Sequence, residues 1–168
     1  VGQPGEKCTA CSFGTYKNVS GHQKCSVCPE NAYTLLKAST RLDDCMCNAG
    51  YSGENGKSCT ICEAGRYKVG RGNGTCQNCP NLTTSPAGSG VIGECTCSPG
   101  AYGPNGAKCR LCEVGKFKPE AGTDDCTDCA PNSNSPLGSN MSESCQCNDG
   151  YSGSVTPACM NANECCVN

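Results

Sequence analysis

The sequence predicts a small disulfide-rich fold, arranged as a linear array of three modules of about 50 residues with short β-hairpins, loops and almost no helix. Three observations lead to this prediction. Cysteine supplies 21 of the 168 residues, beside 22 glycines and no tryptophan. The cysteines recur with a period of about 50 residues. The apolar residues show no helical periodicity, and turn-forming residues are abundant.

Composition also limits the class of protein. Cysteine at more than one residue in ten is typical of a disulfide scaffold, because small modules that bury little apolar surface need covalent crosslinks. Disulfides persist in oxidising compartments, so we expect a secreted, extracellular or cell-surface chain. The net charge of −2 and the lack of a basic cluster argue against a nucleic-acid partner. No apolar run is long enough to insert into a membrane, and no secretory signal is visible, so we expect a mature chain or a segment of a longer one.

The repeat is defined by cysteine positions and by a shared motif. Cys8, Cys59, Cys109 and Cys159 are separated by 51, 50 and 50 residues. The sequences GTYK, GRYK and GKFK place a glycine, an aromatic residue and a lysine at one position of each repeat: 14–17, 65–68 and 115–118. A period of this length indicates successive modules, each contacting mainly its neighbours.

The cysteine pattern sets the expected module boundaries. We predict three cysteine-rich repeats, at 11–59, 62–109 and 112–159. Residues 1–10 would then be the end of a preceding module or an N-terminal tail. Residues 160–168 would begin a divergent or truncated module, because the position equivalent to Cys62 and Cys112 is Ala162.

Two families resemble the repeat. The C-x-C, the Gly-aromatic turn and the final cysteine resemble the C-terminal half of an EGF-like module, with Tyr51 covering the Cys47–Cys59 bridge. The order C-x2-C, Gly-aromatic-Lys, C-x2-C-P and C-x-C-x2-G is similar to the cysteine-rich repeat of ephrin receptors, and this resemblance extends over residues 8–159. Ala101 stands at the aromatic position of the second repeat, with Tyr102 one residue later, so we expect an altered turn there.

Six cysteines allow 15 pairings, and the resemblance implies one of them. It implies first-to-third, second-to-fourth and fifth-to-sixth bridges, which are Cys11–Cys28, Cys25–Cys45, Cys47–Cys59, Cys62–Cys79, Cys76–Cys95, Cys97–Cys109, Cys112–Cys129, Cys126–Cys145 and Cys147–Cys159. Tumour-necrosis-factor-receptor-like modules, which the repeat also resembles, would instead pair Cys11–Cys25 and Cys28–Cys45. Both patterns keep the fifth-to-sixth bridge. Each closed loop contributes roughly 3 kcal/mol in the chain-entropy picture.

Competing chemistry explains the pattern less well. Two C-x2-C pairs are also typical of a four-cysteine zinc site, but zinc would leave the C-x-C and the last cysteine of every repeat unused. Redox-active C-x2-C pairs lie at a helix N-terminus, and no such helix is indicated. His22 lies in a polar loop and is interpreted as a solvated residue. We therefore expect no enzyme, no catalytic residues and no small-molecule substrate.

Modification and metal binding give two further expectations. Acceptor sequons for N-linked glycans occur at four positions, Asn18, Asn73, Asn81 and Asn140, and we expect at least two to be occupied. The stretch NANEC resembles the entry of a calcium-binding growth-factor-like module. Asn161, Asn163 and Glu164 offer oxygen ligands that calcium accepts, but an asparagine in place of the first acid makes this a weak site. We expect no other cofactor.

The odd number of cysteines bears on function. The module boundaries leave Cys8, Cys165 and Cys166 as inter-chain or unassigned residues, since an odd set cannot pair within one chain. Contact of Cys8 with Cys165 or Cys166 of a second copy would be head-to-tail, and such an interface builds a filament when it does not close. We expect a non-enzymatic extracellular glycoprotein rod, a structural subunit of a fibre, surface appendage or matrix. The alternative is a spacer or ligand-presenting segment of a cell-surface receptor or adhesion protein.

Overall fold

The structure is a computed structural model that describes residue 5 and residues 7–153. The chain divides into two compact units. The first contains the residues up to Asn78 together with Pro86–Ile92, and the second contains Cys79–Ser85 together with the residues from Gly93 onward. The division passes through the second repeat, so each unit contains the place where one repeat meets the next.

Each repeat opens with a short antiparallel hairpin that carries the motif aromatic residue in its first strand. The three strand pairs are β1 (Thr15–Tyr16) with β2 (Ser26–Val27), β7 (Arg66–Tyr67) with β8 (Gln77–Asn78), and β13 (Lys116–Phe117) with β14 (Thr127–Asp128). Arg66 Nε donates to Asn78 Oδ1 at 2.9 Å, and Lys116 Nζ lies 2.9 Å from Asp128 Oδ1. These pairs join residues directly opposite each other, where cross-strand contacts stabilise a two-stranded ladder.

A second hairpin follows, and a 3-10 turn precedes its second strand. The strand pairs are β3 (Ala32–Thr34) with β4 (Cys45–Cys47), β9 (Thr83–Thr84) with β10 (Thr96–Cys97), and β15 (Ser133–Asn134) with β16 (Gln146–Cys147). The turns are η1 (Leu42–Asp44), η2 (Ile92–Glu94) and η3 (Ser142–Ser144).

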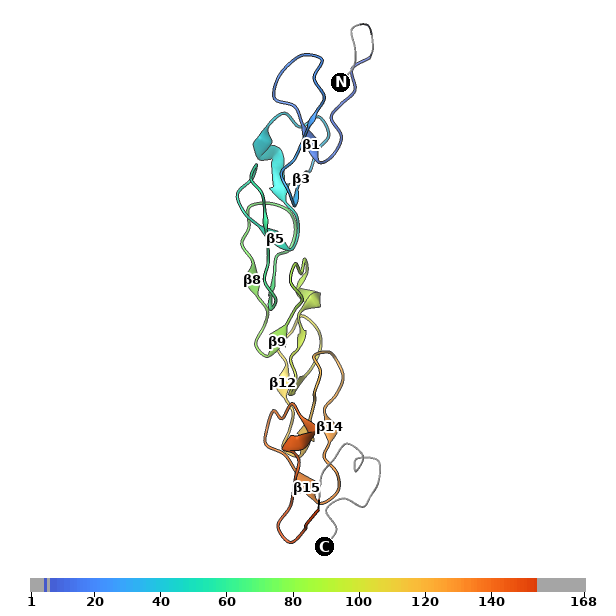
Figure 1. The fold of residues 1–168 in the computed structure, drawn as a ribbon, viewed down its shortest axis with the longest axis vertical. Helices are drawn as coiled ribbons and strands as arrows, with labels where there is room; N and C mark the ends of the chain where they lie inside the picture. The colour runs from blue at the N-terminus through green and yellow to red at the C-terminus, as the bar shows by residue number, and fades with distance from the viewer. Residues whose placement is uncertain (1–4, 6, 154–168) are drawn as a thin grey trace. The chain divides into compact units, whose positions relative to one another are not determined.

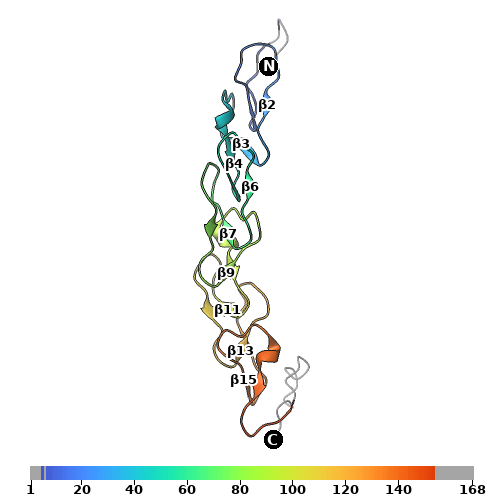
Figure 2. The ribbon, with the colours of Figure 1, turned by 60° about the vertical axis from the view of Figure 1, so that its left-hand side comes forward.

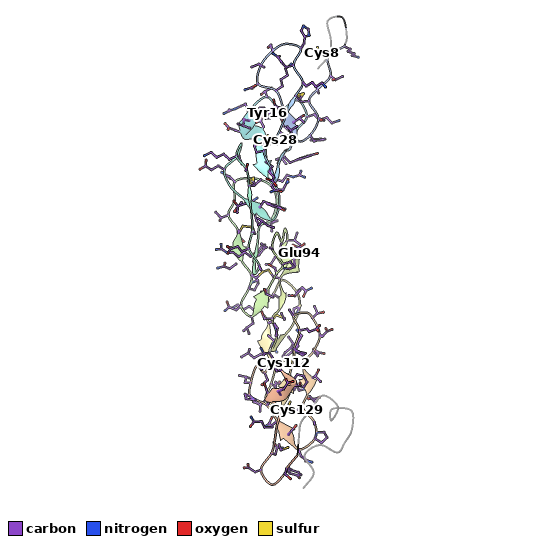
Figure 3. All side chains as sticks on the ribbon, viewed as in Figure 1. Cys8, Tyr16, Cys28, Glu94, Cys112 and Cys129 are labelled. Atoms are coloured by element: carbon purple, nitrogen blue, oxygen red, sulfur yellow. A yellow bond between two sulfur atoms is a disulfide. The ribbon has the colours of Figure 1, made fainter. Side chains whose placement is uncertain are left out.

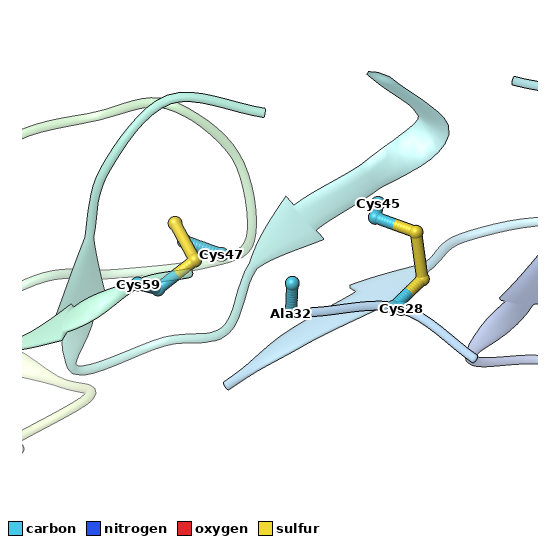
Figure 4. Close-up of a cluster of buried hydrophobic side chains, with 5 residues drawn as sticks. All are labelled: Cys28, Ala32, Cys45, Cys47 and Cys59. Atoms are coloured by element: carbon cyan, nitrogen blue, oxygen red, sulfur yellow. A yellow bond between two sulfur atoms is a disulfide. The ribbon is translucent and has the colours of Figure 1, made fainter. Parts of the chain in front are cut away.

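The C-x-C spacing is explained by the second hairpin. Side chains alternate between the faces of a strand, so Cys45 and Cys47 point to the same face, and both are fully buried. Figure 4 shows their two bridges, to Cys28 and Cys59, on either side of Ala32. Crosslinked sulfur atoms thus take the place of a large aliphatic core in this repeat.

A third hairpin ends the first two repeats. It pairs β5 (Tyr51–Ser52) with β6 (Thr60–Ile61), and β11 (Ala101–Tyr102) with β12 (Arg110–Leu111). In the first unit the hairpins follow one another in chain order from β1 through β3 and β5 to β8 (Figure 1). In the second unit β9, β11, β13 and β15 do the same (Figure 2).

The disulfides correct part of the expected pairing. The described bridges run first-to-second, third-to-fourth and fifth-to-sixth: Cys11–Cys25, Cys28–Cys45, Cys47–Cys59, Cys62–Cys76, Cys79–Cys95, Cys97–Cys109, Cys112–Cys126 and Cys129–Cys145. The expected Cys47–Cys59 and Cys97–Cys109 bridges are confirmed. The expected bridges Cys11–Cys28, Cys25–Cys45, Cys62–Cys79, Cys76–Cys95, Cys112–Cys129 and Cys126–Cys145 are wrong. The expected Cys147–Cys159 bridge lies outside the described residues.

Strand geometry gives the reason for the correction. Cys25 and Cys28 flank the extended strand β2, which separates their Cα atoms by about 10 Å at 3.3 Å per residue. Cys28 adjoins the second hairpin and lies 5.6 Å from Cys45, whereas Cys25 lies 5.8 Å from Cys11 at the start of the repeat (Cα to Cα). Bridged cysteines need Cα atoms within about 7 Å of each other. Cys25 and Cys28 therefore cannot exchange their partners, Cys11 and Cys45, without movement of the backbone.

The predicted fold class is confirmed. The described residues form two-stranded hairpins, loops and 3-10 turns without an α-helix, and among them no helical segment has the length and apolar character needed to cross a membrane. The expected change of turn at Ala101 is wrong. Ala101 pairs with Leu111 as Tyr51 pairs with Ile61, because the preceding glycine keeps the same φ of 76° in both repeats.

Candidate functional site: the joint between repeats

The C-terminal loop of the first repeat forms a joint with the second repeat inside the first unit. The Gly50 N–H donates to the Lys68 carbonyl at 3.0 Å, and the Gly50 carbonyl accepts the Cys62 N–H at 2.8 Å. The Gly72 N–H donates to the Cys47 carbonyl at 2.9 Å. These three backbone bonds hold the Cys-x2-Gly segment of one repeat against the start of the next, in one register.

Glycine is required at the centre of this joint. Gly50 is buried and has a φ of +76°, which L-residues with a side chain rarely adopt. A Cβ at this position would lie 1.9 Å from the Gly88 carbonyl oxygen, which is part of the backbone of the second repeat. The Gly88 N–H donates to the Cys62 carbonyl at 2.8 Å, so this backbone is itself held in place. The joint therefore depends on direct contact of two main chains.

A buried lysine completes the joint. Lys68 is only 4% exposed, and its Nζ donates to three carbonyls, those of Cys47 at 3.4 Å, Asn48 at 3.2 Å and Gly70 at 3.2 Å. Two of these acceptors belong to the first repeat. Burial lowers the pKa of Lys68 from its ordinary value of 10.5. Bonds from an ammonium to carbonyls are stronger than neutral ones, so Lys68 ties the loop to the motif.

The second unit contains an equivalent joint between the second and third repeats. The Gly100 N–H donates to the Lys118 carbonyl, the Cys112 N–H to the Gly100 carbonyl, and the Gly122 N–H to the Cys97 carbonyl, at 2.8, 2.8 and 2.9 Å. A Cβ on Gly100 would lie 2.3 Å from the backbone oxygen of its neighbour Gly138. This geometry is therefore a property of the repeat.

Lys118 is the buried lysine of the second joint. It is 3% exposed and its Nζ donates to the carbonyls of Ala101 at 3.0 Å and Gly122 at 2.8 Å. Burial lowers its pKa, while the Asp124 carboxylate acts in the opposite direction. Two lysines at equivalent motif positions are thus withdrawn from water and used inside the fold.

The motif aromatic residue precedes each lysine in the chain and is buried in the second and third repeats. Tyr67 is 8% exposed and Phe117 5% exposed, whereas Tyr16 in the first repeat is half-buried. The backbone N–H groups of Lys68 and Lys118 donate to the carbonyls of two buried serines, Ser89 and Ser139. The Gly-aromatic-Lys motif therefore supplies a turn and a buried apolar side chain to its own repeat, and a cation to the joint.

The structure places several predicted site residues on the surface. All four sequon asparagines, Asn18, Asn73, Asn81 and Asn140, are exposed, and their glycosylation stays a prediction. Cys8 is exposed and not bridged (Figure 3). Cys165, Cys166 and the calcium candidates Asn161, Asn163 and Glu164 lie outside the described residues. Within residues 5 and 7–153 no group of three His, Cys, Asp or Glu residues is placed to hold a metal ion.

Sequence reasoning missed Lys68 and Lys118 as functional residues. The signal was present, because the motif lysine recurs in all three repeats. A lysine near the surface is ordinarily solvated, however, and recurrence of the motif alone does not distinguish a buried lysine that holds the fold together from an exposed charge. The motif lysine is buried because the neighbouring repeat supplies backbone carbonyls that accept its hydrogen bonds.

Comparison with known families bears directly on the repeat. The family model described as tyrosine-protein kinase ephrin type A/B receptor-like matches residues 2–45 and again residues 50–95, together more than half of the chain. The ephrin-receptor-like resemblance of the cysteine pattern is thereby confirmed. The matched segments start and end at other positions than the predicted repeats, whose boundaries stay a prediction.

Individual relatives match shorter stretches. The chain is 31% identical over 81 residues to the sushi, von Willebrand factor type A, EGF and pentraxin domain-containing protein 1 of Rattus norvegicus and to that of Mus musculus, which covers 46% of this chain and 2% of each relative. It is 44% identical over 43 residues to ephrin type-B receptor 1 of Gallus gallus, covering 26% of this chain and 4% of the receptor. The chain thus spans only a small part of the length of these relatives.

Proposed function

Because the chain belongs to the tyrosine-protein kinase ephrin type A/B receptor-like family, we propose that it is a non-enzymatic structural array of an extracellular protein, in which each joint fixes the register of two successive repeats. The observation that carries this proposal is the buried motif lysine bound to carbonyls of the preceding repeat. Such a bond serves no purpose in an isolated module. The eight described disulfides support an oxidising, extracellular compartment.

The comparisons favour a spacer over a binding domain as the role of this array. The relatives carry names that combine several kinds of domain or denote a receptor, and the matching stretch is a small fraction of each. A segment that forms its hydrogen bonds within its own joints is suited to set the distance between other domains. A fibre subunit would use the same joints, with further copies in place of other domains.

A direct test measures whether the joint couples neighbouring repeats. In ¹⁵N relaxation of the full chain, we expect the amides of Tyr51 and Tyr67 to share one rotational correlation time. The Lys68→Met variant should give these two amides different correlation times, whereas the matched exposed variant Lys57→Met should keep them equal. Equal correlation times in Lys68→Met would remove the proposed role of Lys68 in coupling the two repeats.

Ligand presentation is a second candidate, favoured by one surface. The first repeat has LLKAS at 35–39, where the other repeats have SPAGS at 85–89 and SPLGS at 135–139. Leu36 is 72% exposed, and Leu35 and Phe13 are also exposed. An exposed apolar surface of this kind is suited to contact another protein. Leu36→Ser would weaken such a contact and leave the joint amides protected.

N-linked glycans complete the proposed function. The four sequon asparagines are exposed, so the transferase would reach each of them without unfolding the chain. We expect enzymatic deglycosylation in heavy water, followed by mass spectrometry of secreted protein, to mark at least two of the four. A chain that carries no mark at any sequon would contradict both the glycan assignment and the secretory route.

A further inference from the structure

Asn-Gly dipeptides occur at three places in the chain, Asn55-Gly56, Asn73-Gly74 and Asn105-Gly106. In such a dipeptide the backbone nitrogen of the glycine can attack the side-chain carbonyl carbon of the asparagine, because glycine has no Cβ to obstruct the approach. The attack needs an accessible side chain and a peptide that is free to turn toward it. The three dipeptides differ in these conditions.

Two of the dipeptides are held inside hairpin turns. The Gly56 N–H donates to the Cys45 carbonyl at 2.8 Å, and the Gly106 N–H donates to the Cys95 carbonyl at 2.7 Å. Each bond fixes the peptide plane that would have to turn toward the asparagine side chain. Asn105 is nevertheless exposed. The bond at Gly106, and not burial of the side chain, therefore restrains this dipeptide.

The remaining dipeptide, Asn73-Gly74, lies in the loop between β7 and β8. Both residues are exposed, and within the described residues the Gly74 N–H forms no hydrogen bond. Gly70 and Gly72 precede it, and a Cβ built on either would meet no atom within 4 Å, so little packing restrains the loop. The repeats on both sides of this loop are described, and its exposure is therefore a property of the folded array.

We propose that Asn73 is a site of spontaneous deamidation, which gives the first joint a carboxylate after the chain has folded. The Gly74 nitrogen bonds to the Asn73 Cγ and loses its proton, while the Cγ–Nδ2 bond breaks and ammonia leaves. The product is a five-membered succinimide ring. Water then adds to one ring carbonyl and breaks its bond to the ring nitrogen, which regains a proton, so that aspartate or isoaspartate remains. Water is the co-reactant, and no oxidation or reduction takes place.

The new carboxylate would lie close to the buried lysine of the joint. A Cβ built on Gly74 would lie 3.5 Å from the Lys68 Cε, so the loop runs alongside this side chain. In the third repeat the position equivalent to Gly74 carries Asp124, whose carboxylate raises the pKa of Lys118. The sequence from residue 69 to residue 75 has no acidic residue until Asn73 is converted. Deamidation thus supplies the first joint with the kind of charge that the second joint already has.

Glycosylation and deamidation exclude each other at Asn73. A glycan occupies the side-chain nitrogen that would leave as ammonia, and a carboxylate at residue 73 accepts no glycan. The test therefore uses the secreted full chain with Thr75→Ala, which removes the sequon and keeps the Asn73-Gly74 pair. The folded protein is kept in heavy-oxygen water at neutral pH, so that each new carboxylate carries a heavy oxygen. Peptide mapping by mass spectrometry then measures conversion at the three dipeptides.

In the folded chain we expect Asn73 to convert at least about tenfold faster than Asn55 and Asn105, because the bonds of their glycines must open first. Gly74→Ala adds a Cβ at an ordinary contact distance and should slow the conversion several-fold while the fold is kept. After reduction and unfolding, the three dipeptides should convert at similar rates, because the protecting bonds are lost. Equal rates in the folded chain would overturn the inference, and so would conversion of Asn73 that occurs only after unfolding.

The effect of the charge is measured with Asn73→Asp, which installs the carboxylate permanently. The ¹³Cε shift of Lys68 should titrate at higher pH than in the parent, because a nearby negative charge favours the ammonium. The matched control Asn73→Gln changes the same side chain without a charge and should leave the titration as it is. An unchanged Lys68 in Asn73→Asp would overturn the role of the carboxylate at the joint. Hydrogen exchange at Gly50 keeps this result apart from the proposed function, since an unprotected Gly50 amide in the parent would contradict the joint itself.

Discussion

The two internal joints share their backbone contacts and differ in how the lysine is used. Lys68 donates to the carbonyls of Cys47 and Asn48, whereas Lys118 donates to that of Ala101, three or four residues further along the equivalent loop. The glycine bonds on either side agree within 0.2 Å, from 3.0 to 2.8 Å for the glycine N–H. The backbone register is therefore the fixed part of the joint, and the flexible lysine adapts to the carbonyls that the register leaves within reach.

The largest expected effect comes from adding a single methyl group to the central glycine of a joint. Gly50→Ala and Gly100→Ala would place a Cβ 1.9 and 2.3 Å from backbone oxygens. Because neither backbone can move without losing hydrogen bonds, we expect each to destabilise its joint by more than about 3 kcal/mol, measured by hydrogen exchange.

The control for this change is Gly70→Ala. Gly70 has a similar φ of +71° and no atom within 4 Å of its Cβ position, so only the backbone strain of about 1 kcal/mol remains. Equal losses of stability in Gly70→Ala and Gly50→Ala would show that glycine is needed at residue 50 for its positive φ, and not for the contact of two main chains.

Removing the cation tests the adaptable part of the joint. Lys68→Met and Lys118→Met keep most of the apolar stem but leave carbonyls without their charged donor. We expect a loss of about 2 kcal/mol in joint stability for each, since bonds to charged groups contribute more than neutral ones. Lys17→Met should change stability by less than about 0.5 kcal/mol, because the Lys17 ammonium donates to the Gly21 carbonyl within its own repeat. A loss at Lys17 as large as at Lys68 would contradict a role specific to the joints.

A smaller gain is expected where one repeat departs from the other two. Asn31 and Asn132 occupy the same left-handed position with φ near 58–59°, and the second repeat has Leu82 there at 62°. Asparagine adopts this conformation far more readily than leucine. Because Leu82 is 42% exposed, Leu82→Asn removes little packing and should raise unfolding stability by about 1 kcal/mol. Denaturant unfolding that shows a lower stability would contradict the strain at this position.

The smallest effect is a difference in titration. Burial lowers the pKa of Lys68 and Lys118. By contrast, the carboxylate of Glu54 raises the pKa of Lys57, and that of Asp128 raises the pKa of Lys116. The ¹³Cε shifts of the first pair should therefore titrate at lower pH than those of the second pair. A reversed order would contradict the burial of the joint lysines.

This titration also fixes the sign of a stability change. The folded chain holds the proton of each buried lysine less tightly than the unfolded chain does. Between the lowered pKa and 10.5 the unfolded state binds more protons, so the contribution of these groups to stability rises with pH there and is lost as pH falls through the lowered pKa.

Part of the fold follows from spacing alone. The C-x-C pair is predictable, since alternation along a strand puts Cys45 and Cys47 on one face, and the short loop to Cys59 allows a bridge within a hairpin. The partners of Cys25 and Cys28 are not predictable in this way. Both cysteines lie at similar sequence distances from their candidate partners, Cys11 and Cys45. Which partner each one takes depends on the extended strand between Cys25 and Cys28 and on where the second hairpin begins.

The candidate site was less accessible to sequence reasoning. The motif at 65–68 is visible as a repeat, but a lysine with a long apolar stem is compatible with solvent and with burial. Its burial depends on Cys47 and Asn48, about 20 residues away in another repeat. Ala101 illustrates the same limit, because the missing ring leaves the turn unchanged when the backbone bonds of Gly100 determine it.

The local pattern of the disulfides has a consequence for the order of folding. Each described bridge joins cysteines only 12–17 residues apart, and no bridge crosses another within a repeat. Loops of this length close rapidly and at a lower entropic cost than longer loops, and the contacts they make are local in sequence, so contact order is low. During synthesis at roughly 5–20 residues per second, each crosslink becomes available within seconds of the previous one. The chain can therefore mature vectorially from its N-terminus, each finished repeat offering its Cys-x2-Gly segment as a template for the next.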